Sequence, residues 1–535
     1  MEGQELKAMG PSAYEEINRR QTLDDLDREY LARLGKKAVL KRNFGFMSIL
    51  GFSCTILITW EGSLVTFMEP FANGGPSGVF YSYLLVWAGT FATFVTIAEL
   101  ASMAPTSGGQ YHWVSMLAPS SAYKFLSYIT GWATVAGWQA SLSSASYLSA
   151  TLIQGLIKLT HPGYNMQPWH GTLLYWAIIA FTVFINVISS GLLPKFEGLI
   201  LVLHILGFFA ILIPLAYLAE HSPPSAVFNS WLNEGDYQTQ TLSFFVGIVG
   251  NVFAFSGADA AVHMSEEIQN ASRVVPTSII TTIVINGSLG LGMILTVLFS
   301  LGNVEKALKS PTGYPFMEIF LEATESVAGS TVMASIITIL GLCATVGGMA
   351  SASRMIWSFS RDRGIPGWKI LSRLDPRTSI PVWSIATTTT IACLLALINL
   401  GSSVAFNDVI SLSVAGLYSS YLICCSLLLW RRCTNQILIR SDSAGSQLVN
   451  TPGATLTWGP FRIPGIFGII VNSIAVIYLI IAIFFSFWPT KRVVTVESMN
   501  YSSVGYSSVV IISVVYYFVR ARKVYTGPVI EIDPQ

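Results

Sequence analysis

Residues 45–72 read GFMSILGFSCTILITWEGSLVTFMEPFA, an apolar run of bilayer length with the polar sequence Trp60-Glu61-Gly62-Ser63 near its centre. A carboxylate at mid-membrane depth is costly, on the order of 3 kcal/mol or more, and glycine beside it weakens the helix. Residues 241–268 repeat this arrangement, because FSGAD at 255–259 places an acidic residue after small residues midway along the run. The two runs predict membrane helices that are broken near the bilayer centre.

Apolar runs of similar length continue along the chain. A spanning helix needs about 20 apolar residues. The sequence contains twelve candidates: 45–72, 78–103, 123–155, 171–190, 195–219, 241–268, 277–301, 331–360, 381–399, 404–430, 466–487 and 505–519. Charged residues make up only 11% of the chain, against about 25% in a typical soluble domain. We therefore predict an all-α integral membrane protein, with twelve transmembrane helices in a transporter domain over 44–520 and polar tails at 1–43 and 521–535.

Basic residues set the expected orientation of the spans. With a cytosolic N-terminus, 25 of the 30 Lys and Arg residues fall on the cytosolic side, as the positive-inside rule requires. The even number of spans then places the C-terminus in the cytosol as well. Asn500-Tyr501-Ser502 is a glycosylation sequon on the predicted outer side, with Asn500 as the acceptor. A net charge of +1 gives no reason to expect a nucleic-acid partner; the lipid bilayer is the expected surrounding.

The broken spans are the first and the sixth of the twelve. Broken helices at corresponding positions of two five-helix halves are typical of an inverted repeat with a binding site at the membrane midplane. The long loops 104–122 and 302–330 also occupy equivalent positions, on opposite predicted sides. We therefore predict a five-plus-five inverted repeat, followed by two C-terminal helices. Half-helix ends and freed carbonyl groups would bind the charged parts of a substrate there.

Several stretches resemble a known transporter superfamily. Three of them, AELASMAPTSGGQYHW (98–113), FAFSGADAAVHMSEEIQNASRVVP (253–276) and SRDRGIP (360–366), resemble the amino acid–polyamine–organocation superfamily. Three shorter ones, TWEG (59–62), NGGP (73–76) and GWATVAGWQA (131–140), look like its fungal amino acid/choline branch, which includes GABA, choline and polyamine permeases. The resemblance covers nearly all of residues 40–520.

The resemblance implies that substrate binds at the unwound centres of spans one and six. Carried over by position, the substrate-binding residues are Thr59, Trp60, Glu61, Gly62, Ser63, Phe253, Phe255, Ser256 and Gly257. Trp60 and Glu61 depart from the small Gly-Ser-Gly-like break of the family. This departure favours a substrate with an exposed cation, to which Trp60 would add a cation–π contact.

Ionisable residues within the spans and at their cytosolic ends suggest sites for proton coupling and for an inner gate. Asp259 matches a position that is acidic in some proton-linked relatives, and we expect it to couple transport to protons. His204 lies within span five, where a proton relay and a buried packing role are both open. An inner gate of ion pairs is expected at the cytosolic ends, formed by Glu266, Glu267, Arg273, Arg361 and Asp362.

The expected function is secondary active transport of a small amine or amino acid such as GABA, choline or a polyamine. Proton symport is the expected energy source; Ser351 and Ser353 lie where sodium-coupled relatives place a cation ligand, so sodium stays open. Uptake across the plasma membrane is the default. Export, or vacuolar transport of a small nitrogenous metabolite, is the alternative, and a non-transporting sensor or an intramembrane enzyme is a further one. Neither HExxH nor GxSxG occurs, and we expect no metal and no cofactor.

Overall fold

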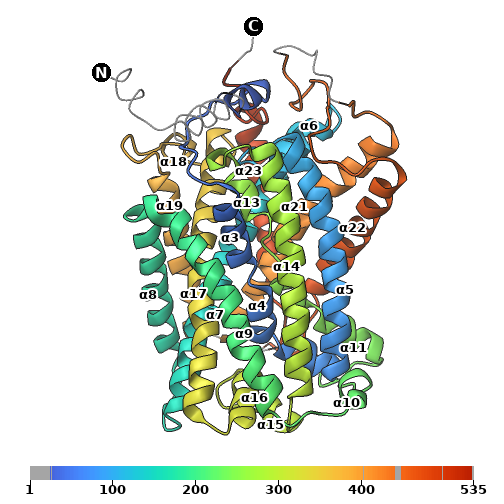
Figure 1. Ribbon diagram of the computed structural model, residues 1–535. Helices are drawn as coiled ribbons and strands as arrows, with labels where there is room; N and C mark the ends of the chain where they lie inside the picture. The colour runs from blue at the N-terminus through green and yellow to red at the C-terminus, as the bar shows by residue number, and fades with distance from the viewer. Residues whose placement is uncertain (1–24, 26, 402, 440–446, 497, 533–535) are drawn as a thin grey trace, which may run out of the picture.

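The computed structural model describes residues 25, 27–401, 403–439, 447–496 and 498–532. Within these residues the chain is a bundle of helices with isolated β-bridges and no strand (Figure 1). Ten helices are long and apolar enough to cross a membrane. They are α3 with α4 (Phe46–Leu57, Thr59–Val65), α5 (Met68–Met103), α8 (Pro168–Val187), α9 (Leu193–Leu218), α14 (Ala271–Phe299), α17 (Val327–Arg361), α19 with α20 (Val382–Leu395, Ile398–Gly401), α21 (Ser403–Cys433), α22 (Gly465–Ser486) and α23 (Ser502–Val519). This confirms the all-helical membrane architecture.

Two predicted spans fall outside these ten for different reasons. Helix α7 (Tyr123–Thr160) is long enough at 38 residues, but Ser, Thr, Gly and Ala along it make it less apolar than the others. The sixth predicted span is divided into α11 (Gln240–Gly247), α12 (Val249–Ala254), α13 (Ala260–His263) and the 3-10 turn η3 (Ser265–Glu267). Each piece is too short to cross a membrane alone.

The two breaks differ in form. In the sixth span, Phe255–Asp259 leaves the helix, and Gly257 adopts φ 101°, as the small-residue sequence predicts. In the first span the break lies at Ile58, which adopts φ 30° and ψ 47°, and α4 begins at the next residue. The prediction of a break at Trp60-Glu61-Gly62 is therefore wrong by two to four residues. A β-branched residue is rarely found in this conformation, so packing holds it there.

Helix α5 begins ten residues before its predicted start at residue 78. It opens at Met68 and kinks at Gly75, where φ is 66°. A Cβ at Gly75 would lie 2.8 Å from the backbone of Ser230 and Leu232, so only glycine fits. Pro76 follows directly and removes one helical hydrogen bond. The sequence Asn73–Pro76 reads as a loop, but tertiary packing keeps it helical on both sides of the kink.

The two ends of the bundle are distinct. We call one the tail end, because residues 25–44 and 520–532 both lie there (Figure 1). The backbone N–H of Lys37 donates to Glu531 at 2.9 Å, and the N–H of Glu531 donates to the carbonyl of Gly35 at 2.7 Å. Helix α6 (Gln110–Leu117) also lies at the tail end. At the opposite, far end are α10 (Pro224–Phe228), α15 (Val304–Leu308) and α16 (Pro315–Thr324).

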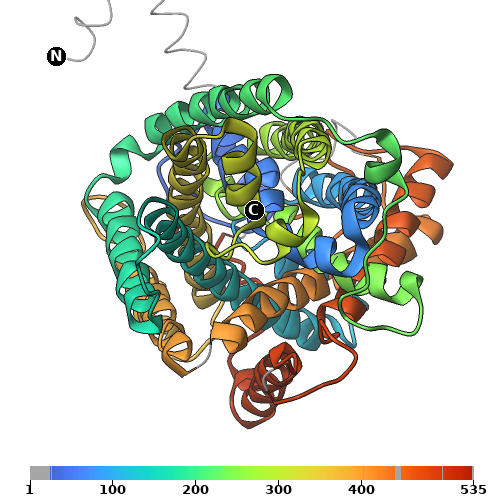
Figure 2. The ribbon, with the colours of Figure 1, turned by 90° about the horizontal axis from the view of Figure 1, so that it is seen from below.

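The broken first span lies inside the bundle. Seen along the helices, α8, α9 and α19 form part of the rim and α23 stands at the periphery (Figure 2). Of the ten spans, Phe46–Val65 is the most buried and Ser502–Val519 the least. The helices that carry the polar breaks are therefore shielded from lipid by the others, as unsatisfied backbone groups require.

We expect Gly137→Ala to lower the melting temperature of the purified protein in detergent. Helices α7 and α21 cross here: a Cβ at Gly137 would lie 2.7 Å from the Leu417 nitrogen, and one at Gly416 would lie 2.8 Å from the Gly137 Cα. Backbone cannot move aside as a flexible side chain does, so the helices must separate. Gly292→Ala is the control, because its Cβ would meet Phe208 at an ordinary 3.4 Å. Equal melting temperatures for the two variants would refute this.

Candidate functional site

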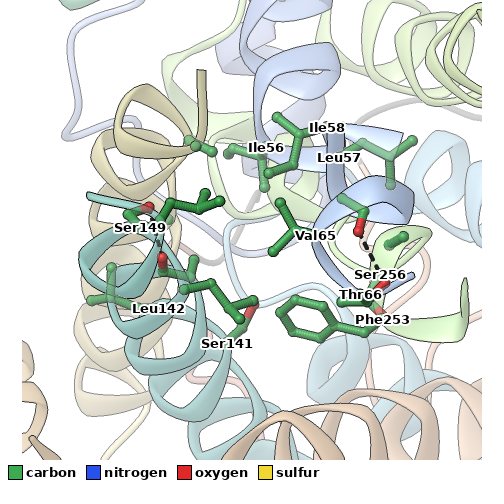
Figure 3. A pocket seen from close by; sticks show the side chains of 18 of the residues that line it. Ile56, Leu57, Ile58, Val65, Thr66, Ser141, Leu142, Ser149, Phe253 and Ser256 are labelled. Carbon is green, nitrogen blue, oxygen red and sulfur yellow. Dashed lines mark hydrogen bonds between the residues drawn. The ribbon is translucent and has the colours of Figure 1, made fainter. Parts of the chain in front are cut away.

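A small cavity lies beside the break between α3 and α4. Its volume is about 60 Å³, enough for only a few waters. Figure 3 shows Val65 and Phe253 on one side of it and Leu142 and Ser149 on the other. The lining residues are Ile56, Leu57, Ile58, Gly62, Val65, Thr66, Trp138, Ser141, Leu142, Ala145, Leu148, Ser149, Leu152, Phe253, Ala254, Ser256, Gly341, Ala344 and Gly348. Three of the predicted substrate-binding residues are among them: Gly62, Phe253 and Ser256.

The lining carries no charged side chain, and three of its four hydroxyl groups share one feature. The Ser149 hydroxyl donates to the Ala145 carbonyl at 2.8 Å, and that of Ser256 to the Val252 carbonyl at 2.8 Å. The Thr66 hydroxyl donates to the Gly62 carbonyl at 2.9 Å. A hydroxyl has one proton and two lone pairs, so each oxygen is left as an acceptor. The cavity is suited to one ammonium group, held by neutral oxygens.

Trp138 connects the cavity to the ionisable residues on its tail-end side. Its ring lines the cavity and meets the ring of His263 edge-on, with centroids 5.6 Å apart. A Cβ at Gly257 would lie 3.7 Å from the Trp138 ring, so Trp138 also packs against the break of the sixth span. A structural change in the cavity or at the break of the sixth span therefore affects the other through the rigid ring of Trp138.

Asp259 is held in a buried network drawn from three elements. The Tyr421 hydroxyl of α21 donates to Oδ1 at 2.5 Å, and the Gln110 amide of α6 donates to Oδ2 at 2.7 Å. His263 Nε2, on α13, lies 3.4 Å from Oδ2. Side chains of α6, α13 and α21 all contact this carboxyl group, so Asp259 links the three elements.

The geometry of His263 assigns one of its protons. Nδ1 lies 3.0 Å from the carbonyl oxygen of Ser107, which only accepts hydrogen bonds, so Nδ1 carries a hydrogen. His263 Nε2 faces Asp259 Oδ2, so Asp259 and His263 lie together as a buried carboxyl–imidazole pair.

The other predicted substrate-binding residues lie away from the cavity. Glu61 points to α9, where its Oε1 lies 2.6 Å from Nδ1 of His204, and both side chains are buried. The ring of Trp60 lies 5.8 Å from that of His204. The remaining predicted residues that do not line the cavity are Thr59, Ser63, Phe255 and Gly257. The structure therefore brings Glu61 and His204 together as a buried pair outside the cavity lining.

Ion pairs join the sixth and eighth spans at the tail end. Glu266 accepts two hydrogen bonds from Arg361, at 2.7 and 2.8 Å, and one from the Ser107 nitrogen at 3.1 Å. Glu267 accepts one from Nε of Arg354 at 2.9 Å. The side chain of Arg273 is exposed, and among the described residues no ion pair includes it. Four of the five predicted gate residues thus lie at this closure, and Arg273 does not.

Asp362 ties both chain ends to this closure. Its Oδ1 accepts from Lys36 Nζ at 2.5 Å and from the Val529 nitrogen at 2.8 Å, and its Oδ2 accepts from the Tyr111 hydroxyl at 2.6 Å. Burial alone would raise the pKa of Asp362, but Lys36 and Arg361 hold this pKa below its usual 3.8. A lowered carboxyl pKa stabilises the folded form above the unfolded value, and the contribution is lost only as pH falls below it. The contact is therefore not a pH switch in the physiological range.

A wider vestibule lies on the other side of the cavity. It measures about 490 Å³, includes Glu69 and Tyr314, and shares Val65, Thr66 and Leu148 with the small cavity. These three side chains are what separates the two spaces. The cavity is thus nearly open to the far end, whereas ion pairs and both tails close it from the tail end.

Asn500 lies at the far end, between α22 and α23. Its side chain is 7% exposed, and its Nδ2 donates to the carbonyls of Ser486 and Trp488 at 2.9 and 3.0 Å. Glycosylation uses this nitrogen, so a glycan would have to displace both hydrogen bonds. In the folded chain Asn500 therefore links the start of α23 to the end of α22.

Several site residues were missed by sequence reasoning, although two of them lie in the quoted motifs. Gln110 belongs to 98–113 and Trp138 to 131–140. Tyr421 and Ser149 come from long helices with no local signal, because only packing shows which face of a helix borders a cavity. The missed residues are Thr66, Gln110, Trp138, Ser141, Ser149 and Tyr421.

Comparison with known proteins agrees with this architecture. The sequence profile of the amino acid permease family matches residues 44–514. The chain is similar to the choline transporter of Saccharomyces cerevisiae (26% identical, covering 94% of this chain and 85% of the relative) and to the amino-acid permease BAT1 of Arabidopsis thaliana (28%, covering 94% and 96%). It is also similar to the GABA-specific permease of S. cerevisiae (25%, covering 94% and 86%). These relatives are transporters and not enzymes. The chain belongs to the amino acid permease family, within the amino acid–polyamine–organocation superfamily, and is a multi-pass membrane transporter of amino acids or organic cations.

Proposed function

We propose that this chain is a secondary active, proton-coupled carrier that takes one small amine or amino acid across the plasma membrane by alternating access. The observation that carries the proposal is an uncharged cavity beside two helix breaks, closed from the tail end and separated from the far-end vestibule by three side chains. A carrier needs such a site between two closures. The tail end, to which the positive-inside rule assigns the cytosol, is the closed side.

Twelve spans and a five-plus-five repeat fit this proposal. With α7 and the broken sixth span added, the ten helices become twelve, and an even number agrees with both tails lying at one end. The loop after the second span carries α6 at the tail end, whereas the equivalent loop after the seventh carries α15 and α16 at the far end (Figure 1). Opposite placement of equivalent parts is what an inverted repeat predicts.

The chemistry of the cavity limits the range of candidate substrates. Hydroxyl acceptors and the rings of Trp138 and Phe253 suit a single ammonium or quaternary amine. A polyamine would bring further cationic groups into a lining without a carboxylate, where an uncompensated charge is costly. Glu61 is paired with His204 and faces away. We therefore favour choline, GABA or another substrate with one cationic group over polyamines, in keeping with the names of the relatives in yeast.

Proton coupling is assigned to Asp259 with His263, and a second buried pair, Glu61 with His204, borders the first break. His263 lies between Asp259 and the ring of Trp138, so substrate in the cavity is linked to a proton on the Asp259–His263 pair through Trp138. Binding of one then changes the affinity for the other, which is the linkage that symport needs.

We expect purified protein in proteoliposomes to accumulate one of choline, GABA or a monoamino acid when the interior is alkaline. Putrescine and spermidine should compete weakly, because the lining offers no carboxylate for their second charge. Radiolabelled uptake with and without a pH gradient measures this. The control is Ser141→Leu, which fills the cavity without touching the proton-binding pairs. Substrate binding without accumulation by the unmodified chain would contradict transport and favour a sensor.

A further inference from the structure

Glu197 lies about one helical turn from the start of α9, yet its side chain is fully buried. Helix α3 covers it closely: a Cβ at Gly51 would lie 2.7 Å from the Glu197 carbonyl oxygen, so glycine permits this approach. Leu50, Cys54 and Leu201 form a buried apolar cluster at the same contact. The carboxyl group therefore lies in an apolar seam between two transmembrane helices, with α17 packed alongside.

No hydrogen-bond donor reaches this carboxyl group within the described part of the chain. Both Oε1 and Oε2 are buried without a donor. The polar side chain that lies against it is Thr55, and the Thr55 hydroxyl already donates to the Gly51 carbonyl at 2.7 Å. A hydroxyl has only one proton to give. Thr55 therefore offers Glu197 a lone pair, which suits a carboxyl group that is itself the donor.

The helices around Glu197 bring no counter-charge to it. Besides Glu197, their ionisable side chains are Lys195, His204 and the exposed Tyr217 on α9, Cys54 on α3, Cys343, Arg354 and Arg361 on α17, Arg273 at the start of α14, and His170 and Tyr175 at the far-end start of α8. Arg354 and Arg361 are taken by Glu267 and Glu266, and His204 by Glu61. Lys195 and Arg273 are exposed. An ionised carboxylate without a donor or a counter-charge is strongly disfavoured in such a seam, so Glu197 is protonated in this conformation.

We propose that Glu197 is a proton-release site on the tail-end side, separate from Asp259. Glu197 holds a proton while α3 covers it and loses that proton when α3 moves away. The inference rests on the proposed carrier function. In the release step the carboxyl O–H bond breaks, water accepts the proton, and the carboxylate stays on Glu197. Closing α3 again requires the carboxylate to regain a proton.

The position of Glu197 is what gives it this role. Helix α3 is the tail-end half of the broken first span, and the left-handed residue Ile58 separates it from α4. Movement of α3 alone would open the tail-end side of the cavity and hydrate Glu197 in the same motion. Because ionised Glu197 opposes closure over an apolar seam, reprotonation becomes a condition for returning to the conformation described here. Each transport cycle then requires a protonation step at Glu197, on the tail-end side, as well as one at Asp259.

The first test is infrared difference spectroscopy of the purified chain, which needs no substrate. A carbonyl stretch of a protonated carboxyl group should persist at neutral pH, and it should be absent in Glu197→Gln. If the band is as strong at neutral pH in Glu197→Gln as in the unmodified chain, it arises from another group, and the proposal is overturned. Gln is close in shape to the protonated acid, and we expect this variant to fold.

The second test measures protons moved per substrate in proteoliposomes with a pH-sensitive dye. Glu197→Gln should reduce this ratio while leaving substrate exchange without a gradient near the unmodified rate. Lys195→Gln, an exposed neighbour on the same helix, should leave the ratio unchanged. An unaltered ratio in Glu197→Gln overturns the release role. If the unmodified chain moves no substrate while the infrared band is lost in Glu197→Gln, the proposed carrier function is wrong, whereas the protonated state of buried Glu197 is confirmed.

Discussion

Asp259→Asn is expected to abolish proton-driven accumulation while leaving the carrier folded. With the membrane potential clamped, the ratio of internal to external substrate should fall to about one, because a carrier without coupling can only equilibrate its substrate. Asn keeps the size of Asp and still accepts from Tyr421. Its amide would face the Gln110 amide, but the Gln110 Oε1 has no partner among the described residues. A flip of Gln110 therefore restores the hydrogen bond.

Counterflow uptake into preloaded proteoliposomes separates coupling from binding. Asp259→Asn should still exchange substrate at a measurable rate, with its pH dependence flattened. Glu305→Gln is the matched control, because it removes an exposed carboxylate of α15 that pairs only with Lys309. Gradient-driven accumulation by Asp259→Asn at the level of the unmodified chain would refute the assignment. Loss of both accumulation and exchange, with an unchanged melting temperature, would place Asp259 in substrate binding instead.

The pattern of the sequence was sufficient for the membrane fold but not for the orientation of side chains. Apolar runs and the FSGAD interruption mark helices and the second break, because bilayer length and small residues act locally. The first break was misplaced, since Ile58 is held in a left-handed conformation by packing that no local sequence records. Glu61 was read as a cation site because it is a carboxylate at mid-depth, yet its helical phase turns it toward His204.

The same limit explains what was predicted of the ionisable groups. The charged residues at these helix ends were predicted to lie near one another because they share one side of the membrane, and Glu266 and Arg361 do form an ion pair. Glu197 and Lys195 lie two residues apart near the start of one predicted span, yet α3 buries Glu197 and Lys195 stays exposed. The approach of α3 depends on Gly51, which precedes Glu197 by 146 residues and lies in another helix, and single-sequence reasoning has no access to such a contact. Long-range packing, and not residue type, decides which carboxylates are solvated.

Arg361→Met is expected to cause the largest loss of folded protein among single changes at the tail end. It leaves Glu266 buried without its bidentate partner, and breaking a buried pair from one side costs about 3–5 kcal/mol. That loss is a large fraction of the stability of a typical domain. The melting temperature in detergent and the yield of monodisperse protein measure it. Lys309→Met, which removes an exposed pair with Glu305, should leave both unchanged.

The double variant Glu266→Gln/Arg361→Met distinguishes a gate from a structural pair. Replacing both partners removes the uncompensated charge, so much of the lost stability should return. If the pair also closes the tail end, the double variant should rest more often with that end open. A cysteine at Ser141, in a Cys433→Ser background, should then react faster with an impermeant thiol reagent added from the tail-end side. Recovered stability with unchanged labelling would mean that the ion pair stabilises the fold and does not hold the gate, since only a gating contact biases the two conformations differently.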